Sequence, residues 1–250
     1  RISPIGQKET HKFLSALNDF YRTSRFNDFF NTHTDIYELG LQVFNDSVMA
    51  HFDQEWYTRF YGTPPAEQFR IIIGFTNGPC NYGPSRKLTG QPKEVFAIMN
   101  YAVDDNERPI FYKKVVETVV HEFCHSFTKI KGDTEKALEK SGKALQEYTY
   151  FSMRRQAYST WRNILEESLV RAATICYLID HNYDEKDIRN AIIEQVDRNF
   201  FWMPELVQTL RYYESHRKKY PTFTSFYPEI IRFFDRYVTN MEKEMKKAMK

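Results

Sequence analysis

Two histidines four residues apart, with a glutamate beside the first, are the residues of this chain best suited to do chemistry. His121-Glu122-Phe123-Cys124-His125 has the spacing H-E-x-x-H. Side chains four residues apart lie on the same face of a helix, so the two imidazoles can bind one metal ion, above all Zn²⁺. Glu122 lies about 100° around the helix from His121, where a general base acting on a metal-activated water is required. The motif therefore predicts a zinc site with a base beside it.

The residues around this motif indicate the helix that must carry it. One face of the segment is continuously apolar, through Val115, Val116, Val119, Val120, Phe123 and Phe127. Both histidines fall on the opposite side, so the apolar face can pack into a core while the imidazoles point away from it. A chance occurrence of the motif would not usually have this arrangement. Cys124 points away from both histidines and is expected to be a small buried residue rather than a ligand.

Two histidines do not complete a catalytic zinc site, which usually has three protein ligands, commonly including a carboxylate. The segment 161–172 is apolar over most of its circumference and predicts a buried helix, in which an ionised carboxylate is costly unless it is paired or binds metal. Glu167 lies there on a narrow polar strip with Asn163 and Arg171. It either forms an ordinary salt bridge with Arg171 or binds the metal, oriented by Arg171 or Asn163. Glu166 remains an alternative third ligand, because one helical wheel does not decide between adjacent residues.

The pattern of apolar residues predicts helices before and after a small sheet. The expected strands are 69–75 and 94–101, and the expected helices are 8–22, 34–60, 110–130, 134–150, 155–180, 184–198, 204–217 and 223–248. This is an α+β fold, predominantly α-helical, with the small sheet packed on the H-E-x-x-H helix. We expect a single domain over residues 1–250, made of N-terminal helices (1–66), the sheet with its long loop (67–104), and the motif helix with the C-terminal helical part (105–250).

The connection between the two expected strands is long for a hairpin and rich in Gly, Pro and Asn, which favours a functional loop over a plain turn. Residues 81–85 and an edge strand at 94–101 are candidates to hold an extended substrate by strand addition. Tyr82 either presents its ring and hydroxyl to substrate or packs down onto the sheet.

Composition excludes several classes of protein. The formal net charge is +2, without the clustered basic face of a nucleic-acid-binding protein. No apolar run approaches the length of a membrane span. The three cysteines, Cys80, Cys124 and Cys176, are an odd number at wide spacing and predict no disulfide framework. The chain begins with Arg1, as expected of a processed or trimmed product, so the residues do not reveal a compartment, and they do not reveal an oligomeric state.

The order of these motifs resembles a known superfamily. H-E-F-C-H followed by Glu167 on a later helix looks like the gluzincin type of zinc metallopeptidase, the thermolysin-like superfamily with its zincin-like fold. The fuller pattern, Asn81-Tyr82-Gly83-Pro84, then H-E-F-C-H-S-F, then E-E-S-L-V-R-A, is similar to an uncharacterised bacterial family of Bacteroides-type organisms, a domain of unknown function. The superfamily resemblance implies His121, His125 and Glu167 as ligands of Zn²⁺ and Glu122 as the catalytic base.

The chain departs from the superfamily at two positions near the third ligand. Arg171 stands where thermolysin-like enzymes commonly have Asp, and Glu166 stands where many have Asn. The superfamily also stabilises the oxyanion with a Tyr or His, and the resemblance does not select among Tyr177, His181, Tyr213 and His216.

The resemblance implies a zinc-dependent hydrolase, most simply a metallopeptidase acting on a peptide or protein substrate. The alternatives are a non-catalytic metal-containing binding or structural module, and a zinc hydrolase of a non-peptide amide. An intact Glu122 favours an enzyme, because a structural zinc ion needs no base beside it. The resemblance alone suggests an extracytoplasmic location, secreted or periplasmic.

Overall fold

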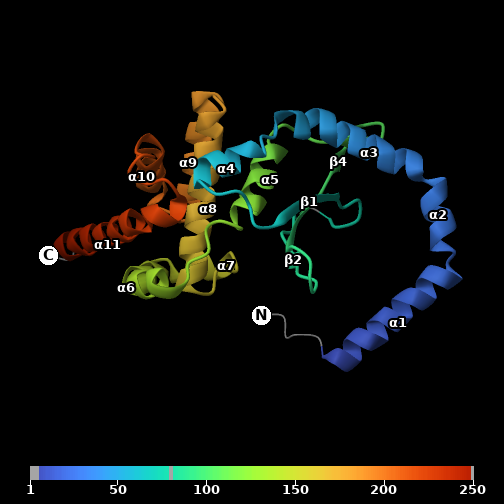
Figure 1. Cartoon of the computed structure of the whole chain (residues 1–250), viewed down its shortest axis with the longest axis horizontal. Coiled ribbons are helices and arrows are strands. Elements are labelled where there is room, and N and C mark those ends of the chain that lie inside the picture. Colours follow the sequence, from blue (N-terminus) through green and yellow to red (C-terminus); the bar gives the residue numbers. More distant parts are fainter. Residues whose placement is uncertain (1–5, 79–80, 249–250) are drawn as a thin grey trace.

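A small sheet lies between an N-terminal helical arm and a larger C-terminal helical body (Figure 1). The structure is a computed structural model that describes residues 6–78 and 81–248. Helices greatly outnumber strands in it, and the expected α+β class with a predominance of helix is confirmed.

The sheet has the strand order β1-β3-β2, formed by β1 (Gln68–Ile73), β3 (Glu94–Met99) and β2 (Ser85–Arg86). β1 and β3 are parallel, whereas β2 is antiparallel to β3. The prediction that 94–101 is an edge strand is therefore wrong, because β3 is the central strand. A connection of more than a dozen residues can cross over to join parallel strands, and here residues 82–86 add to the free side of β3 on the way.

Helix α5 (Val115–Cys124) packs against β3 and against α8 (Trp161–Asp180). Its apolar face is buried, as the sequence predicts, and the rings of Phe123 and Phe69 are stacked with centroids 4.1 Å apart. The opposite face of α5 is thereby turned toward α8. Cys124 and Cys176 are buried free thiols, while Cys80 lies outside the described residues.

The helices expected at 34–60 and 110–130 differ most from prediction. The helix expected at 34–60 is three pieces, α3 (Thr34–Ser47), η1 (Met49–His51) and α4 (Glu55–Tyr61). Asp53 accounts for the break, because its carboxylate accepts the backbone N–H of Trp56 and so begins a new helix.

The helix expected at 110–130 is limited to α5. Of the residues before α5, Ile110 belongs to a short strand, β5 (Pro109–Ile110), which pairs with β4 (Ala102–Val103), and residues 111–114 form coil and a turn. The turn between these two strands is closed by Asp104, whose carboxylate accepts the backbone N–H groups of Asn106 and Arg108, each at 2.9 Å. This local hydrogen bonding closes the hairpin, and the pairing of Ile110 with β4 keeps the start of the expected helix extended.

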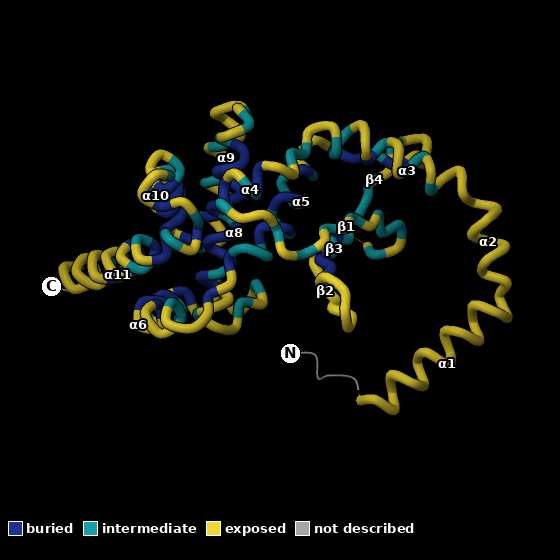
Figure 2. Tube along the Cα trace, in the orientation of Figure 1, coloured by how far each residue is buried: buried dark blue, intermediate teal, exposed yellow. Residues whose placement is uncertain are grey.

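The C-terminal helices agree with prediction to within a few residues, except that α8 begins at 161 and a short helix precedes it. They are α6 (Gly132–Tyr148), α7 (Tyr150–Arg155), α8, α9 (Glu185–Asp197), α10 (Met203–Ser215) and α11 (Phe223–Ala248). Thr160 caps α8 by accepting the Asn163 N–H at 3.2 Å, which explains the later start. α8 is the most completely buried helix, in accord with its apolar circumference (Figure 2).

The chain begins with an arm of two helices, α1 (Gln7–Thr23) and α2 (Phe26–Thr32), that curves away from the sheet and the helical body (Figure 1). All of their residues are exposed (Figure 2). In the part of the chain that the structure describes, no helix combines the length and apolar character needed to cross a membrane.

Candidate metal centre

The packing of α5 against α8 brings both motif histidines to the same carboxylate. Nε2 of His121 lies 3.3 Å from Oε1 of Glu167, and Nε2 of His125 lies 3.6 Å from Oε2. One possible ligand atom from each of these three residues lies within 4.8 Å of the others. The three side chains predicted as ligands therefore converge, with the nitrogen and oxygen donors that zinc accepts.

Glu167 is the most deeply buried member of this group, with 5% of its surface exposed. A guanidinium nitrogen of Arg171 lies 2.8 Å from Oε1 of Glu167, one helical turn further along α8. Among the described residues, Oε1 nevertheless accepts no hydrogen bond of good geometry. A buried carboxylate oxygen that is close to a cation but not fully hydrogen bonded retains a lone pair for a further ligand.

Glu166, the alternative third ligand, points elsewhere. Its carboxylate accepts the backbone N–H of Ile130 at 2.9 Å and pairs with Lys129 at 3.1 Å. Both partners belong to the segment that follows α5. Glu166 therefore ties this segment to α8, whereas its neighbour Glu167 faces the histidines.

The protonation states that metal binding requires are favoured by the surroundings. Burial lowers the pKa of His125 to about 4, so its imidazole is neutral near pH 7. Burial acts to raise the pKa of Glu167, but His121 and Arg171 outweigh it and hold this pKa well below its usual range. A neutral imidazole and an ionised carboxylate are the forms that bind a metal ion.

Glu122 lies beside this group, in a hollow between α5 and the edge of the sheet. Burial raises the pKa of its carboxyl above the usual value, and the nearby charge of Glu167 adds to this effect. Gly83 covers the carboxylate so closely that a Cβ atom at this position would overlap Oε2 of Glu122. Glycine at position 83 thus permits the sheet edge to approach the expected base.

The same hollow is lined by residues of the sheet edge and of the end of α5, namely Gly83, Ser85, Lys93, Val95, Glu122, His125, Ser126 and Lys129. The edge above it is residues 82–86, in which the backbone groups of Tyr82 bond to Ile98 at 3.0 and 2.8 Å and the carbonyl of Pro84 accepts the Phe96 N–H at 2.9 Å. Because antiparallel pairing alternates along a strand, the backbone groups of Gly83 point to the other side, away from β3.

Tyr82 and Asn81 both contact β3 or the residue that follows it. Tyr82 pairs with Ile98, and successive side chains of a strand point to opposite faces, so Tyr82 lies on the face opposite to Glu122. Its side chain is 49% exposed there. The side-chain oxygen of Asn81 accepts the backbone N–H of Asn100 at 2.9 Å, which fastens the loop to the end of β3. The loop reaches the site through Gly83 rather than through the tyrosine.

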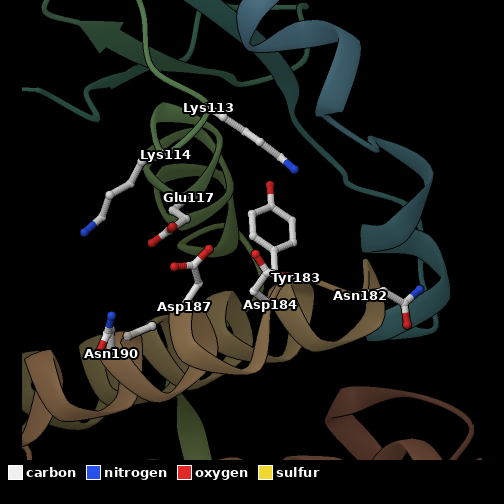
Figure 3. Close-up of a pocket in the computed structure, with 9 residues that line it drawn as sticks. Lys113, Lys114, Glu117, Asn182, Tyr183, Asp184, Asp187 and Asn190 are labelled. Carbon is white, nitrogen blue, oxygen red and sulfur yellow. The ribbon is translucent and has the colours of Figure 1, made fainter.

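A second hollow lies at the other end of α5, where Glu117 precedes His121 by one turn (Figure 3). The carboxylates of Glu117 and Asp187, from α5 and α9, point toward each other. The amine of Lys113 lies 4.6 Å from the centre of the Tyr183 ring. Burial raises the pKa of Glu117, and nearby acidic groups add to this effect. The two hollows thus flank the histidines along the helix.

The four candidate oxyanion residues, Tyr177, His181, Tyr213 and His216, are not brought to the histidines. Each bonds to another part of the chain at 2.7–3.2 Å. Their partners are, in the same order, the carbonyl oxygen of His51, the carboxylate of Asp53, the carbonyl oxygen of Phe60 and the carbonyl oxygen of Tyr212. The bonds of Tyr177, His181 and Tyr213 connect α8 and α10 to residues 51–60, whereas the bond of His216 lies within the last turn of α10.

Tyr158 is a site residue that the sequence analysis missed. Its hydroxyl accepts a hydrogen bond from Arg171 at 3.0 Å, while the same guanidinium pairs with Glu167. Burial raises the pKa of this hydroxyl, and the charge of Glu167 raises it further. The sequence signal that could have indicated Tyr158 is its position two residues before Thr160, which caps the helix that carries Glu167.

The fold and this cluster define an α+β protein with a candidate metal centre formed by two helices. Comparison of the sequence with family models matches residues 3–233 to a domain of unknown function, DUF4932. The match spans most of the chain, so the protein belongs to this family, as the resemblance to an uncharacterised family implied. No curated protein and no solved structure matches the chain.

Proposed function

We propose that the protein is a zinc-dependent hydrolase, a metallopeptidase of the gluzincin type with zincin-like packing of its sheet on α5. The observation that carries the proposal is the convergence of His121, His125 and Glu167, with the carboxylate of Glu122 beside them in an accessible hollow. Two imidazoles and one carboxylate are a common ligand set of catalytic zinc. A purely structural zinc site is usually closed by a fourth protein ligand, which this group lacks among the described residues.

The residues present fit a zinc ion. Glu167 is buried and ionised, and its Oε1 keeps a lone pair that the described residues do not fully satisfy. His125 is neutral, and both histidines turn Nε2 toward Glu167. Arg171 pairs with the Glu167 carboxylate and can orient it, and the hydroxyl of Tyr158 accepts a hydrogen bond from the same guanidinium. Such outer contacts are of the kind that tune metal ligands.

The chemistry follows from the position of Glu122. A bound zinc ion would supply Lewis acidity, which lowers the pKa of a water molecule and polarises a carbonyl group. Glu122 then accepts a proton from the attacking water at its carboxylate and later donates it to the nitrogen of the leaving amine. Partial burial of Glu122 raises its pKa toward the working range of a general base and general acid.

The sheet edge is suited to bind an extended peptide. The backbone groups of Gly83 point away from β3, above the hollow that contains Glu122. A peptide that pairs with this edge as an additional strand would pass directly over the base. Such main-chain pairing is what favours a peptide over a small non-peptide amide as the substrate.

The test combines metal analysis with a cleavage assay on a broad peptide library. Purified protein is expected to contain about one zinc ion per chain and to cleave peptides, with activity lost on chelation and restored by zinc. Glu122→Gln should keep the zinc and lose at least about two orders of magnitude of activity. Glu139→Gln, an exposed carboxylate on α6, is the matched control and should change neither.

The outcomes also separate the alternatives. Protein that binds zinc but cleaves no peptide, and whose zinc content is unaffected by Glu122→Gln, would indicate a non-catalytic module. Cleavage of acylated small molecules but of no library peptide would indicate an amidase. Protein that contains no transition metal before any chelator is used would contradict the proposal altogether.

A further inference from the structure

The helical arm of α1 and α2 exposes an unusually large apolar surface. On α1, five large apolar residues lie within about 120° of the helix circumference, and they are Phe13, Leu14, Leu17, Phe20 and Tyr21. Charged and polar residues occupy the opposite face, among them Lys8, His11, Lys12, Ser15, Asp19 and Arg22. A helix with one apolar stripe normally packs that stripe against another surface.

The stripe continues from α1 onto α2, through Phe26, Phe29 and Phe30. The rings of Phe20 and Phe26 lie 6.4 Å apart across the junction. Further along, Phe30 stacks on Tyr37 at 4.7 Å, which joins the stripe to the body of the protein. We call these eight residues the arm stripe. They are Phe13, Leu14, Leu17, Phe20, Tyr21, Phe26, Phe29 and Phe30.

The arm stripe is larger than the apolar patches usual on monomers. Its eight side chains are between 38% and 64% exposed. If each of the six aromatic rings presents about 200 Å² and is half exposed, the rings alone expose roughly 600 Å², at the upper end of what monomeric proteins show. With the two leucines, the area approaches the ~800 Å² that each partner contributes to a standard protein interface.

A second apolar surface lies on the outer face of the sheet, opposite to α5. Ile72, Ile98 and Tyr82 lie side by side there in the strand register. Phe96 lies two residues before Ile98 on the same face of β3, and the guanidinium of Arg86 lies 5.6 Å from the centre of its ring. Ile72 is 43% exposed and Tyr82 is 49% exposed, and the other two are partly exposed. We call these four residues the outer sheet face.

The two apolar surfaces do not meet within one chain. The arm curves away from the sheet, so α1 lies well apart from β1 and β3 (Figure 1), and every residue of α1 and α2 is exposed (Figure 2). We propose that a second copy of this chain covers them, with the arm stripe of each copy packed on the outer sheet face of the other. This two-fold exchange makes the contact twice and buries a standard-size interface or more.

The charges on the arm favour this protein partner over a lipid surface. The polar side of α1 carries Asp19 together with Lys8, Lys12 and Arg22, and Asp19 pairs with Arg22 at 2.9 Å. A further acidic residue, Glu9, lies at the edge of the apolar stripe. A helix that lies in a membrane interface is typically rich in Lys and Arg on its polar face and has few acidic residues there. The mixed charges of α1 fit a helix whose polar side faces water.

The first experiment measures the mass of the intact chain in solution by size-exclusion chromatography with light scattering. The expected mass is twice the chain mass of 30.0 kDa. Leu17→Glu with Phe20→Glu places two carboxylates in the arm stripe and should yield a folded monomer. His11→Glu with Ser15→Glu adds the same charge to the opposite face of α1 and should leave the dimer intact.

The second experiment locates the contact. In chains that also carry Cys80→Ser, Leu17→Cys is mixed with Ile72→Cys and oxidised, and a disulfide-linked dimer is expected in the mixture but not with either variant alone. Both cysteines in one chain should likewise link two chains. A bond within one chain would show that the arm folds onto its own sheet, and this would overturn the proposal.

Three other results would also overturn it. These are a monomer at all accessible concentrations, a dimer that is insensitive to Leu17→Glu with Phe20→Glu, and a monomer whose arm binds phosphatidylserine vesicles. None of these measurements depends on zinc or on catalysis, so the dimer and the proposed enzyme can be tested separately.

Discussion

Arg171 and His121 both lie close to Oε1 of Glu167, at 2.8 and 3.3 Å, while His125 lies 3.6 Å from Oε2. The guanidinium of Arg171 also donates to the hydroxyl of Tyr158 at 3.0 Å and lies 5.0 Å from the centre of the Phe200 ring. The salt bridge with Arg171 that the sequence analysis offers as one alternative for Glu167 is therefore formed, and the same carboxylate also faces both histidines.

Arg171→Met removes this support while keeping a side chain of similar length. Glu167 would remain buried but lose its only nearby guanidinium among the described residues, so its orientation would be less defined. We expect zinc affinity to fall by about 10- to 100-fold, as for other residues that orient a metal ligand. Competition with a zinc-binding dye measures the affinity. Arg171→Lys, which keeps the charge without the planar fork, should be intermediate. Unchanged affinity in both variants would contradict an orienting role.

Glu167→Gln and Glu166→Gln distinguish the two adjacent carboxylates. Glu167 faces both histidines, whereas Glu166 bonds to Ile130 and Lys129. Glu167→Gln should lose most of the bound zinc, and Glu166→Gln should keep it and lower the melting temperature by a few degrees, as expected for about 1 kcal/mol. Elemental analysis and thermal melts of the two proteins check this. The opposite order of zinc loss would move the third ligand to Glu166.

Gly83→Ala tests the close approach of the sheet edge to the expected base. The added methyl group would overlap the carboxylate of Glu122 and displace it. We expect zinc content to be unchanged and peptide cleavage to fall by about 100-fold, the cost of a displacement of about 1 Å at a reacting group. Ser85→Ala, two residues further along the same edge, is the control and should retain activity. Full activity of Gly83→Ala would show that Glu122 is not held against this edge.

Glu214 should make stability depend on pH. Burial raises the pKa of its carboxyl to about 8, with neighbouring Asp180 contributing, although Arg211 opposes the shift. Because the folded-state pKa lies above the unfolded value, the stabilisation is fully present below about pH 4 and is lost as pH rises through about 8. Glu214→Gln removes this titration. Relative to the natural chain, the variant should therefore gain stability between pH 5 and pH 9. Melting temperatures at both ends of this range measure the effect, and a constant difference between the two proteins would refute it.

The sequence by itself determined the features that depend on local periodicity. The apolar face of α5, the opposite placement of His121 and His125, and the burial of α8 all follow from which residues recur every three or four positions. The register of a helix determines which residues share one of its faces. Residues on the face that is not packed into the core are the ones available to bind a metal ion. The pattern of residues 161–172 therefore limited the candidates for a third ligand to two adjacent glutamates, Glu166 and Glu167, without any structure.

Tertiary structure decided everything that depends on contacts between distant segments. It placed β3 in the centre of the sheet, brought Gly83 onto Glu122, and turned Glu167 rather than Glu166 toward the histidines. It also placed the hydroxyl of Tyr158 where it accepts a hydrogen bond from Arg171. Strand order and the angle at which two helices pack result from the sum of many long-range contacts, and a one-residue change of register turns every side chain of a strand to the other face. No local pattern contains that information.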